Sequence, residues 1–183
     1  MKNNRFGQST VLSNSDYLKI RKNQLNVKHQ LAYDIAWYTG ERFGAIIQLK
    51  VSNCFEPGGK AREYITFQKN TRKASPDGTQ KTRQVPIHST LREILNNYPL
   101  TKYSHWLFPG ACIYQHVHLR TCDYLLRKTL EKAGLGNKGI STHSFRRSFA
   151  SRLNALGVDI KTIQILALLN HNMNYALAIS LQG

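Results

Sequence analysis

Residues 31–53 have the sequence LAYDIAWYTGERFGAIIQLKVSN, in which Thr-Gly separates two apolar stretches. Before it, apolar side chains recur at helical spacing, which predicts a helix from about Lys28 to Tyr38. Gly40 marks the end of this helix, because glycine tolerates the left-handed conformation that closes many helices. A second helix is expected from Glu41 to about Val51, with Arg42 at its start. Taken alone this arginine is a weak signal, since an ordinary solvent-facing side chain gives the same pattern.

The strongest local signal is in the last third of the chain, where residues 142–147 have the sequence THSFRR. They open a helix expected from about His143 to Leu156, so His143 and Arg146, three residues apart, point the same way. An imidazole beside a guanidinium, near a helix N-terminus that favours anions, suits a phosphodiester. The guanidinium is a rigid fork that matches two phosphate oxygens. The competing interpretation is a surface helix whose basic residues face water.

Between these two motifs the periodicity changes from helical to alternating. Residues 63–69 and 82–88 each predict an extended segment, with Ile65 and Phe67 on one side of the first. A Pro-Asp-Gly turn signal within residues 74–78 joins the two segments into a hairpin with a long tip. Further helices are expected from about Ser15, from Ser89, over residues 117–133 and over residues 160–169.

The order of helices, hairpin and helices predicts a mainly α fold with a small antiparallel β-sheet, an α+β class. The length of 183 residues suits one domain, expected over residues 15–183. The polar residues 1–14 are expected to form a loose N-terminal arm.

The chain is strongly basic, with 26 lysines and arginines against 10 acidic residues and a formal net charge of +16. This excess indicates a polyanionic partner, with a merely soluble basic surface as the alternative. No stretch is apolar enough to span a membrane, and the polar start lacks the core of a signal peptide, so an intracellular protein is expected. The three cysteines are odd in number and widely spaced, which argues against a disulfide framework. The sequence has no CxxC pair and no HExxH motif, which argues against a zinc site.

Together the motifs resemble the catalytic domain of the tyrosine recombinases, the phage integrase family. The order matches: a TG-x-R motif, a lysine-bearing hairpin, an HxxR motif and a later Leu-Asn-His segment. The resemblance extends from about Val11 to about His171. The segments that carry it are Leu31–Asn53, Arg83–Ile87 (RQVPI), Thr142–Leu153 (THSFRRSFASRL) and Leu168–His171 (LLNH).

The resemblance implies roles in breaking a DNA strand. Arg42 and Arg146 would clamp the scissile phosphate and stabilise its five-coordinate transition state. His143 would assist proton transfer beside the same phosphate, and His171 would hydrogen-bond a phosphate oxygen. A hairpin lysine would protonate the leaving 5′ oxygen. Lys73, just after the first strand, is our choice for this lysine, and the alternatives are Lys69 and Lys81.

The implied reaction forms a 3′-phosphotyrosine that retains the energy of the broken bond, so neither ATP nor a metal cofactor is expected. Phosphoryl transfer depends largely on positioning and charge stabilisation, which these cationic groups supply. The expected partners are double-stranded DNA and further copies of the chain assembled on it, with no membrane and no small-molecule substrate. The expected location is the cytoplasm, at the nucleoid.

The nucleophile is where the chain departs most from the family. The family's tyrosine falls about nine residues after the position of His171, where this chain has Ser180. Tyr175 is the last tyrosine, and it follows His171 by only four residues. Four alternatives stay open: Tyr175 acts after a local deletion, Ser180 substitutes, another subunit supplies the tyrosine, or the chain is a truncated DNA-binding remnant that catalyses nothing.

Three other positions differ from the family's pattern and indicate a relaxed or degenerating member. Ala45 stands where an acidic residue commonly supports the first arginine, Asn53 where aspartate is common, and Asn170 where glycine precedes the histidine. The family's N-terminal DNA-clamping domain has no counterpart in this sequence. A DNA-relaxing enzyme of the type IB topoisomerase kind shares the residue set and is a weaker alternative.

Overall fold

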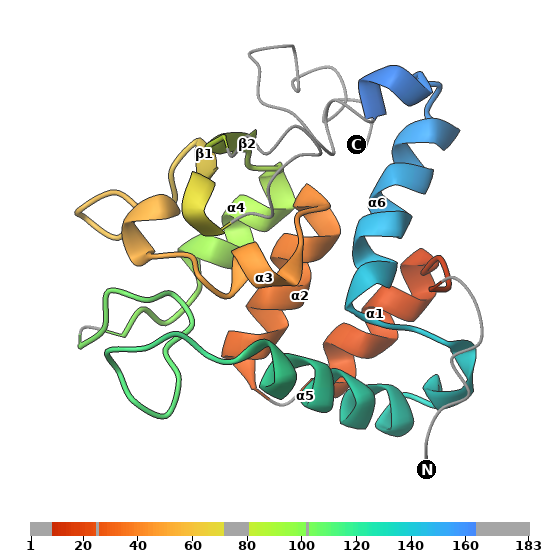
Figure 1. Ribbon diagram of the computed structural model, residues 1–183, viewed down its shortest axis with the longest axis horizontal. Coiled ribbons are helices and arrows are strands. Elements are labelled where there is room, and N and C mark those ends of the chain that lie inside the picture. Colours follow the sequence, from red (N-terminus) through yellow and green to blue (C-terminus); the bar gives the residue numbers. More distant parts are fainter. Residues whose placement is uncertain (1–8, 25, 72–80, 102, 164–183) are drawn as a thin grey trace.

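A computed structural model describes residues 9–24, 26–71, 81–101 and 103–163. The described chain is mainly helical with one small antiparallel sheet, which confirms the predicted class (Figure 1). The elements are α1 (Asn14–Asn23), α2 (Val27–Thr39), α3 (Phe43–Ile46), η1 (Val51–Asn53), β1 (Tyr64–Phe67), η2 (Lys69–Thr71), β2 (Arg83–Pro86), α4 (Ser89–Asn96), α5 (Leu119–Lys132), η3 (Gly136–Lys138) and α6 (Thr142–Ala155).

Helix α2 lies at the centre of the molecule and packs against α1, α3, α4 and α6 (Figure 1). It is buried along most of its length, because its sequence is apolar on nearly every side. Gly40 ends it in the left-handed conformation, with φ of 62°, and the Gly40 N–H donates to the carbonyl of Ala36. The helix predicted before Thr-Gly is therefore confirmed.

The prediction of a single helix over residues 41–51 is wrong, because the segment is divided between the short α3 and the 3₁₀ turn η1. Its backbone pairs instead with a stretch far along the chain. The Val51 N–H donates to the carbonyl of His105 at 2.8 Å, and the Leu107 N–H donates to the carbonyl of Leu49 at 2.9 Å. Backbone groups bound to this neighbour cannot also continue a helix.

Strands β1 and β2 form the predicted hairpin, with Ile65 opposite Val85 and Phe67 opposite Arg83. These four side chains are buried on the inner face of the sheet, as the alternation predicted for Ile65 and Phe67. Arg83 is therefore a charged residue among apolar neighbours. The predicted turn at 74–78 lies outside the described residues.

In the N-terminal segment, where a loose arm is expected over residues 1–14, Leu12 contacts the body of the protein while Thr10, Val11 and Ser13 are exposed. The Leu12 side chain is 3% exposed, and the Leu12 N–H donates to Ser148 Oγ on α6. Arg147 on the same helix donates to the carbonyl of Ser9. The buried Leu12 side chain and these two hydrogen bonds hold the segment against α6, although its composition is polar. Residues 1–8 lie outside the described residues.

Candidate active site

A hollow of about 210 Å³ opens where the α2–α3 turn, η2 and the first turns of α5 and α6 converge. Arg42, His143 and Arg146 all line it, so the structure brings together three residues that the sequence singled out. The starts of α5 and α6 lie near α3 at the centre of Figure 1. The other lining residues are Glu41, Phe43, Gly44, Ala45, Thr71, Leu119 and Thr142.

Arg42 owes its place to the end of α2. The left-handed Gly40 reverses the chain, and Arg42 follows in an extended conformation as the residue that precedes α3. The Arg42 N–H donates to Glu41 Oε1 at 2.9 Å. Among the described residues, the half-buried guanidinium of Arg42 has no hydrogen-bond or ion-pair partner. It is therefore available to a ligand in the hollow.

His143 and Arg146 lie on the first turns of α6, which begins at a reciprocal cap between Ser141 and Ser144. His143 is exposed at the rim. The Arg146 side chain is only 19% exposed, and its Nη1 donates to the carbonyl of Gly40 at 2.8 Å. This bond ties α6 to the end of α2. The N-terminal end of α6 adds its own preference for an anion.

An aromatic cluster of Tyr33, Phe43 and Phe145 reaches the hollow through Phe43, which lines it. The ring centroids are 5.7 Å apart for Tyr33 and Phe43, and 5.5 Å for Phe43 and Phe145. All three side chains are buried. Phe43 directly follows Arg42, and Phe145 directly precedes Arg146. Core packing therefore sets the separation of the two arginines.

Glu41 and Arg83 form a buried ion pair beside the hollow that the sequence reasoning missed. Arg83 Nη1 lies 2.9 Å from Glu41 Oε2, and both side chains are 1% exposed. Arg83 also donates to the carbonyl of Thr39 at 3.4 Å. The available signal was the alternation of β2, which places Arg83 on the inward face with Val85. A buried arginine requires an acidic partner, and Glu41 is next to the glycine turn.

The hairpin reaches the hollow at Thr71, the last residue of η2. Lys69 and Lys81 are both exposed at the base of the hairpin and do not line the hollow. Lys73, His171, Tyr175 and Ser180 lie outside the described residues. Their expected roles therefore stay predictions.

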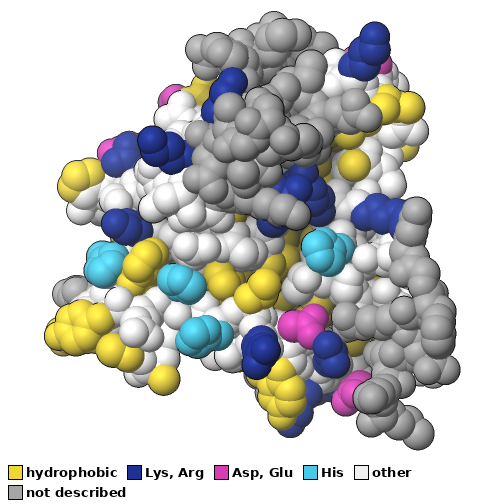
Figure 2. Space-filling view, viewed as in Figure 1, with side chains coloured by type: hydrophobic (Ala, Val, Ile, Leu, Met, Phe, Trp, Pro, Cys, Tyr) yellow, Lys and Arg dark blue, Asp and Glu magenta, His cyan; other side chains and the backbone are white. Residues whose placement is uncertain are grey.

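Basic side chains and histidines are spread over the face of the molecule seen in Figure 2, between apolar and uncharged side chains. Several histidines in this view lie over the loop that precedes α5, where His105 and His118 are exposed. His105 and His116 also contact Trp106, at 4.8 Å and 5.2 Å between ring centroids. This face has the side chains that a polyanion favours.

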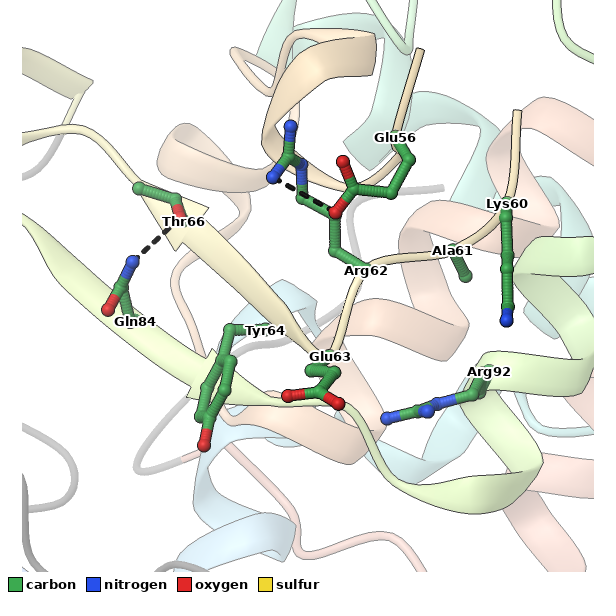
Figure 3. A pocket seen from close by; sticks show the side chains of 9 residues that line it. All are labelled: Glu56, Lys60, Ala61, Arg62, Glu63, Tyr64, Thr66, Gln84 and Arg92. Carbon is green, nitrogen blue, oxygen red and sulfur yellow. Dashed lines mark hydrogen bonds and ion pairs between the residues drawn. The ribbon is translucent and has the colours of Figure 1, made fainter. Parts of the chain in front are cut away.

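A second pocket lies on the outer face of the hairpin (Figure 3). It is lined by Lys60, Arg62 and Arg92, but also by Glu56 and Glu63. Arg62 pairs with Glu56 at 3.2 Å, and Glu63 points towards Arg92 in Figure 3. Because carboxylates share this pocket with the cations, it suits a phosphodiester less well than the hollow does.

Among the residues that the structure describes, no group of three or more His, Cys, Asp or Glu side chains is placed to hold a metal ion. No helix in this part of the chain has the length and apolar character needed to cross a membrane.

Replacing Gly40 with alanine is expected to lower the free energy of unfolding by about 2–3 kcal/mol, which chemical denaturation would measure. A Cβ at Gly40 would lie 2.4 Å from Cδ1 of Phe149, and the φ of 62° disfavours any side chain. Gly44→Ala is the matched control, because a Cβ there meets nothing within 4 Å. Equal effects of the two substitutions would contradict the close approach of α6 to Gly40.

Comparison with known proteins gives a consistent family. The sequence profile of the phage integrase family matches residues 10–175. An integrase/recombinase, y4qK of Sinorhizobium fredii, is 27% identical over 143 residues, which cover 78% of this chain and 42% of that protein. The tyrosine recombinase XerD of Brucella suis is 31% identical over 93 residues, covering 47% of this chain and 30% of its own length. The chain thus spans less than half of each relative.

Solved structures share the fold at low sequence identity. The XerA recombinase has a TM-score of 0.68 at 20% identity, over 95% of this chain and 60% of that one. A lambda integrase dimer bound to a COC' core site has a TM-score of 0.64 at 18% identity, over 97% of this chain and 50% of the lambda protein.

Proposed function

Because the chain belongs to the phage integrase family, we propose that it is the catalytic part of a site-specific DNA recombinase. The observation that carries the proposal is the convergence of Arg42, His143 and Arg146 on one hollow from distant parts of the chain. Two guanidiniums and an imidazole around a common space match a phosphodiester and the extra negative charge of its transition state.

In the proposed reaction a tyrosine oxygen attacks the scissile phosphorus, and the bond to the 5′ oxygen breaks. Arg42 and Arg146 bind the non-bridging oxygens, and His143 at the rim assists proton transfer. The phosphate stays on the tyrosine as a 3′-phosphotyrosine, and the 5′ oxygen leaves as a hydroxyl. Attack by the 5′ hydroxyl of a partner strand reverses these steps, so no ATP is consumed.

Lys73 is the proposed donor of the proton to the leaving 5′ oxygen. It follows Thr71, which lines the hollow, by two residues, and two residues span at most about 7 Å. Lys69 and Lys81 remain alternatives at the base of the hairpin. His171 is proposed to hydrogen-bond the same phosphate, and Tyr175 to be the nucleophile.

Double-stranded DNA is the proposed partner, with further copies of this chain assembled on it at the nucleoid. The net charge of +16 supports binding to a polyanion. The lambda integrase structure holds a dimer on its core site, which supports self-association on DNA.

A second candidate function is a DNA-binding remnant that grips duplex DNA and cleaves nothing. The observation that favours it is Ser180, which stands nine residues after His171, where the family's tyrosine falls. The basic charge and the arginines of the hollow serve this function equally well.

Covalent trapping separates the two functions. A pool of nicked duplexes with random sequence around the nick would be incubated with the protein and resolved under denaturing conditions. The recombinase is expected to give a denaturant-stable adduct that Tyr175→Phe abolishes. Tyr124→Phe, at an exposed tyrosine on α5, should leave the adduct unchanged. Tight DNA binding with no adduct from the natural chain would support the remnant and rule out the enzyme.

A further inference from the structure

We propose that Glu41 is a positioning residue that orients the Arg146 guanidinium and holds the backbone at Arg42, which deepens the proposed function and rests on it. Its carboxylate is 1% exposed and contacts three segments of the chain at once. Oε2 accepts from Arg83 Nη1 on β2 at 2.9 Å. Oε1 accepts from the Arg42 N–H at 2.9 Å and lies 3.8 Å from Arg146 Nη1.

The two carboxylate oxygens thus have different neighbours. Oε2 faces the hairpin, and Oε1 faces the turn and the helix that carry the two arginines of the hollow. Arg146 Nη1 lies between Glu41 Oε1 and the carbonyl of Gly40, at 3.8 Å and 2.8 Å. Because a guanidinium is planar and rigid, fixing one nitrogen against two oxygens sets the direction of the whole fork.

Glu41 is the one acidic residue among the described side chains that line the hollow. An exposed carboxylate there would repel a phosphate, so its burial and its bond to Arg83 matter. The Arg83 guanidinium balances the charge of the carboxylate, so Oε1 can lie near Arg146 without leaving an uncompensated negative charge beside the hollow. Ala45, which also lines the hollow and is 2% exposed, brings no charge of its own. The alignment is therefore assigned to Glu41.

The rival explanation is that Glu41 only neutralises the buried Arg83. A double-variant comparison separates the two roles, using Glu41→Gln, Arg83→Met and both together. Removing both charges of a buried pair is expected to cost less stability than removing one, because a single removal leaves an uncompensated buried charge. The double variant is therefore expected to recover most of the melting temperature that either single variant loses.

The decisive measurement is binding of inorganic phosphate, followed by the ¹H–¹⁵N signal of Arg146 Nε. In the double variant we expect phosphate to bind about tenfold more weakly than in the natural chain, because the Arg146 guanidinium is no longer oriented by the carboxylate 3.8 Å away. Glu56→Gln is the control, since it removes a carboxylate from the exposed pair with Arg62. It should change neither the melting temperature nor phosphate binding.

Recovery of both stability and phosphate affinity in the double variant would overturn the proposal. An Arg146 signal that does not respond to phosphate in the natural chain would also overturn it. Phosphate binding does not require a nucleophile, so a chain that forms no DNA adduct can still show the role of Glu41. Failure of the recombinase reaction and failure of this inference are therefore distinguishable.

Discussion

Replacing Arg83 with methionine is expected to lower the free energy of unfolding by about 3–5 kcal/mol. The substitution leaves the Glu41 carboxylate in a site where its side chain is 1% exposed. Methionine can neither donate to the carboxylate nor balance its charge, and removing one member of a buried ion pair is costly. Urea denaturation at neutral pH, with the slope checked for two-state behaviour, measures the loss.

Arg127→Met is the matched control for this prediction. Arg127 pairs with Asp123 one turn away on α5, and its side chain is 51% exposed. Exposed pairs of this kind contribute at most about 1 kcal/mol. If Arg83→Met and Arg127→Met cost the same, the Arg83–Glu41 pair is not buried as the structure shows.

Replacing Arg146 with lysine is expected to slow formation of the covalent DNA adduct by about 10²–10³-fold, if the proposed reaction operates. Lysine keeps the charge, but it loses the rigid fork that donates to the carbonyl of Gly40 and that we propose binds two phosphate oxygens. Affinity for DNA should fall far less, because the electrostatic attraction is retained. Single-turnover kinetics on a nicked duplex, together with equilibrium binding, measures both quantities.

Arg147→Lys is the natural control, since Arg147 is the next residue on α6 but donates to the carbonyl of Ser9, away from the hollow. The rate of adduct formation by Arg147→Lys should stay within about threefold of that of the natural chain, a change in activation free energy below about 1 kcal/mol. Equal slowing by the two substitutions would mean that Arg146 contributes only bulk charge.

Local signals in the sequence were sufficient where local chemistry decides the structure. The glycine at position 40 ended α2 as predicted, and alternation placed Ile65 and Phe67 inward. The first turn of α6 carries His143 and Arg146 on one side, so that both line the hollow. These features depend on neighbours within one turn or one strand.

What the sequence reasoning missed depends on partners far along the chain. The helix expected over 41–51 is interrupted because Val51 bonds to the carbonyl of His105. The Arg83–Glu41 pair joins two segments that no periodicity connects. Leu12 shows the same effect, since its contact with α6 anchors a segment whose composition predicted a loose arm. Long-range pairing of this kind leaves little trace in a single sequence.

The aromatic cluster under the hollow is contributed by both halves of the chain, with Tyr33 and Phe43 from the first and Phe145 from the second. A cut within the exposed residues 111–115 would leave Arg42 on one fragment and Arg146 on the other. Each fragment would carry only part of the aromatic cluster, so neither fragment alone could bring the two arginines together around a phosphate. Phosphate binding restored on mixing the two fragments would therefore report that the core has reassembled. The protein is thus a candidate for a split complementation reporter.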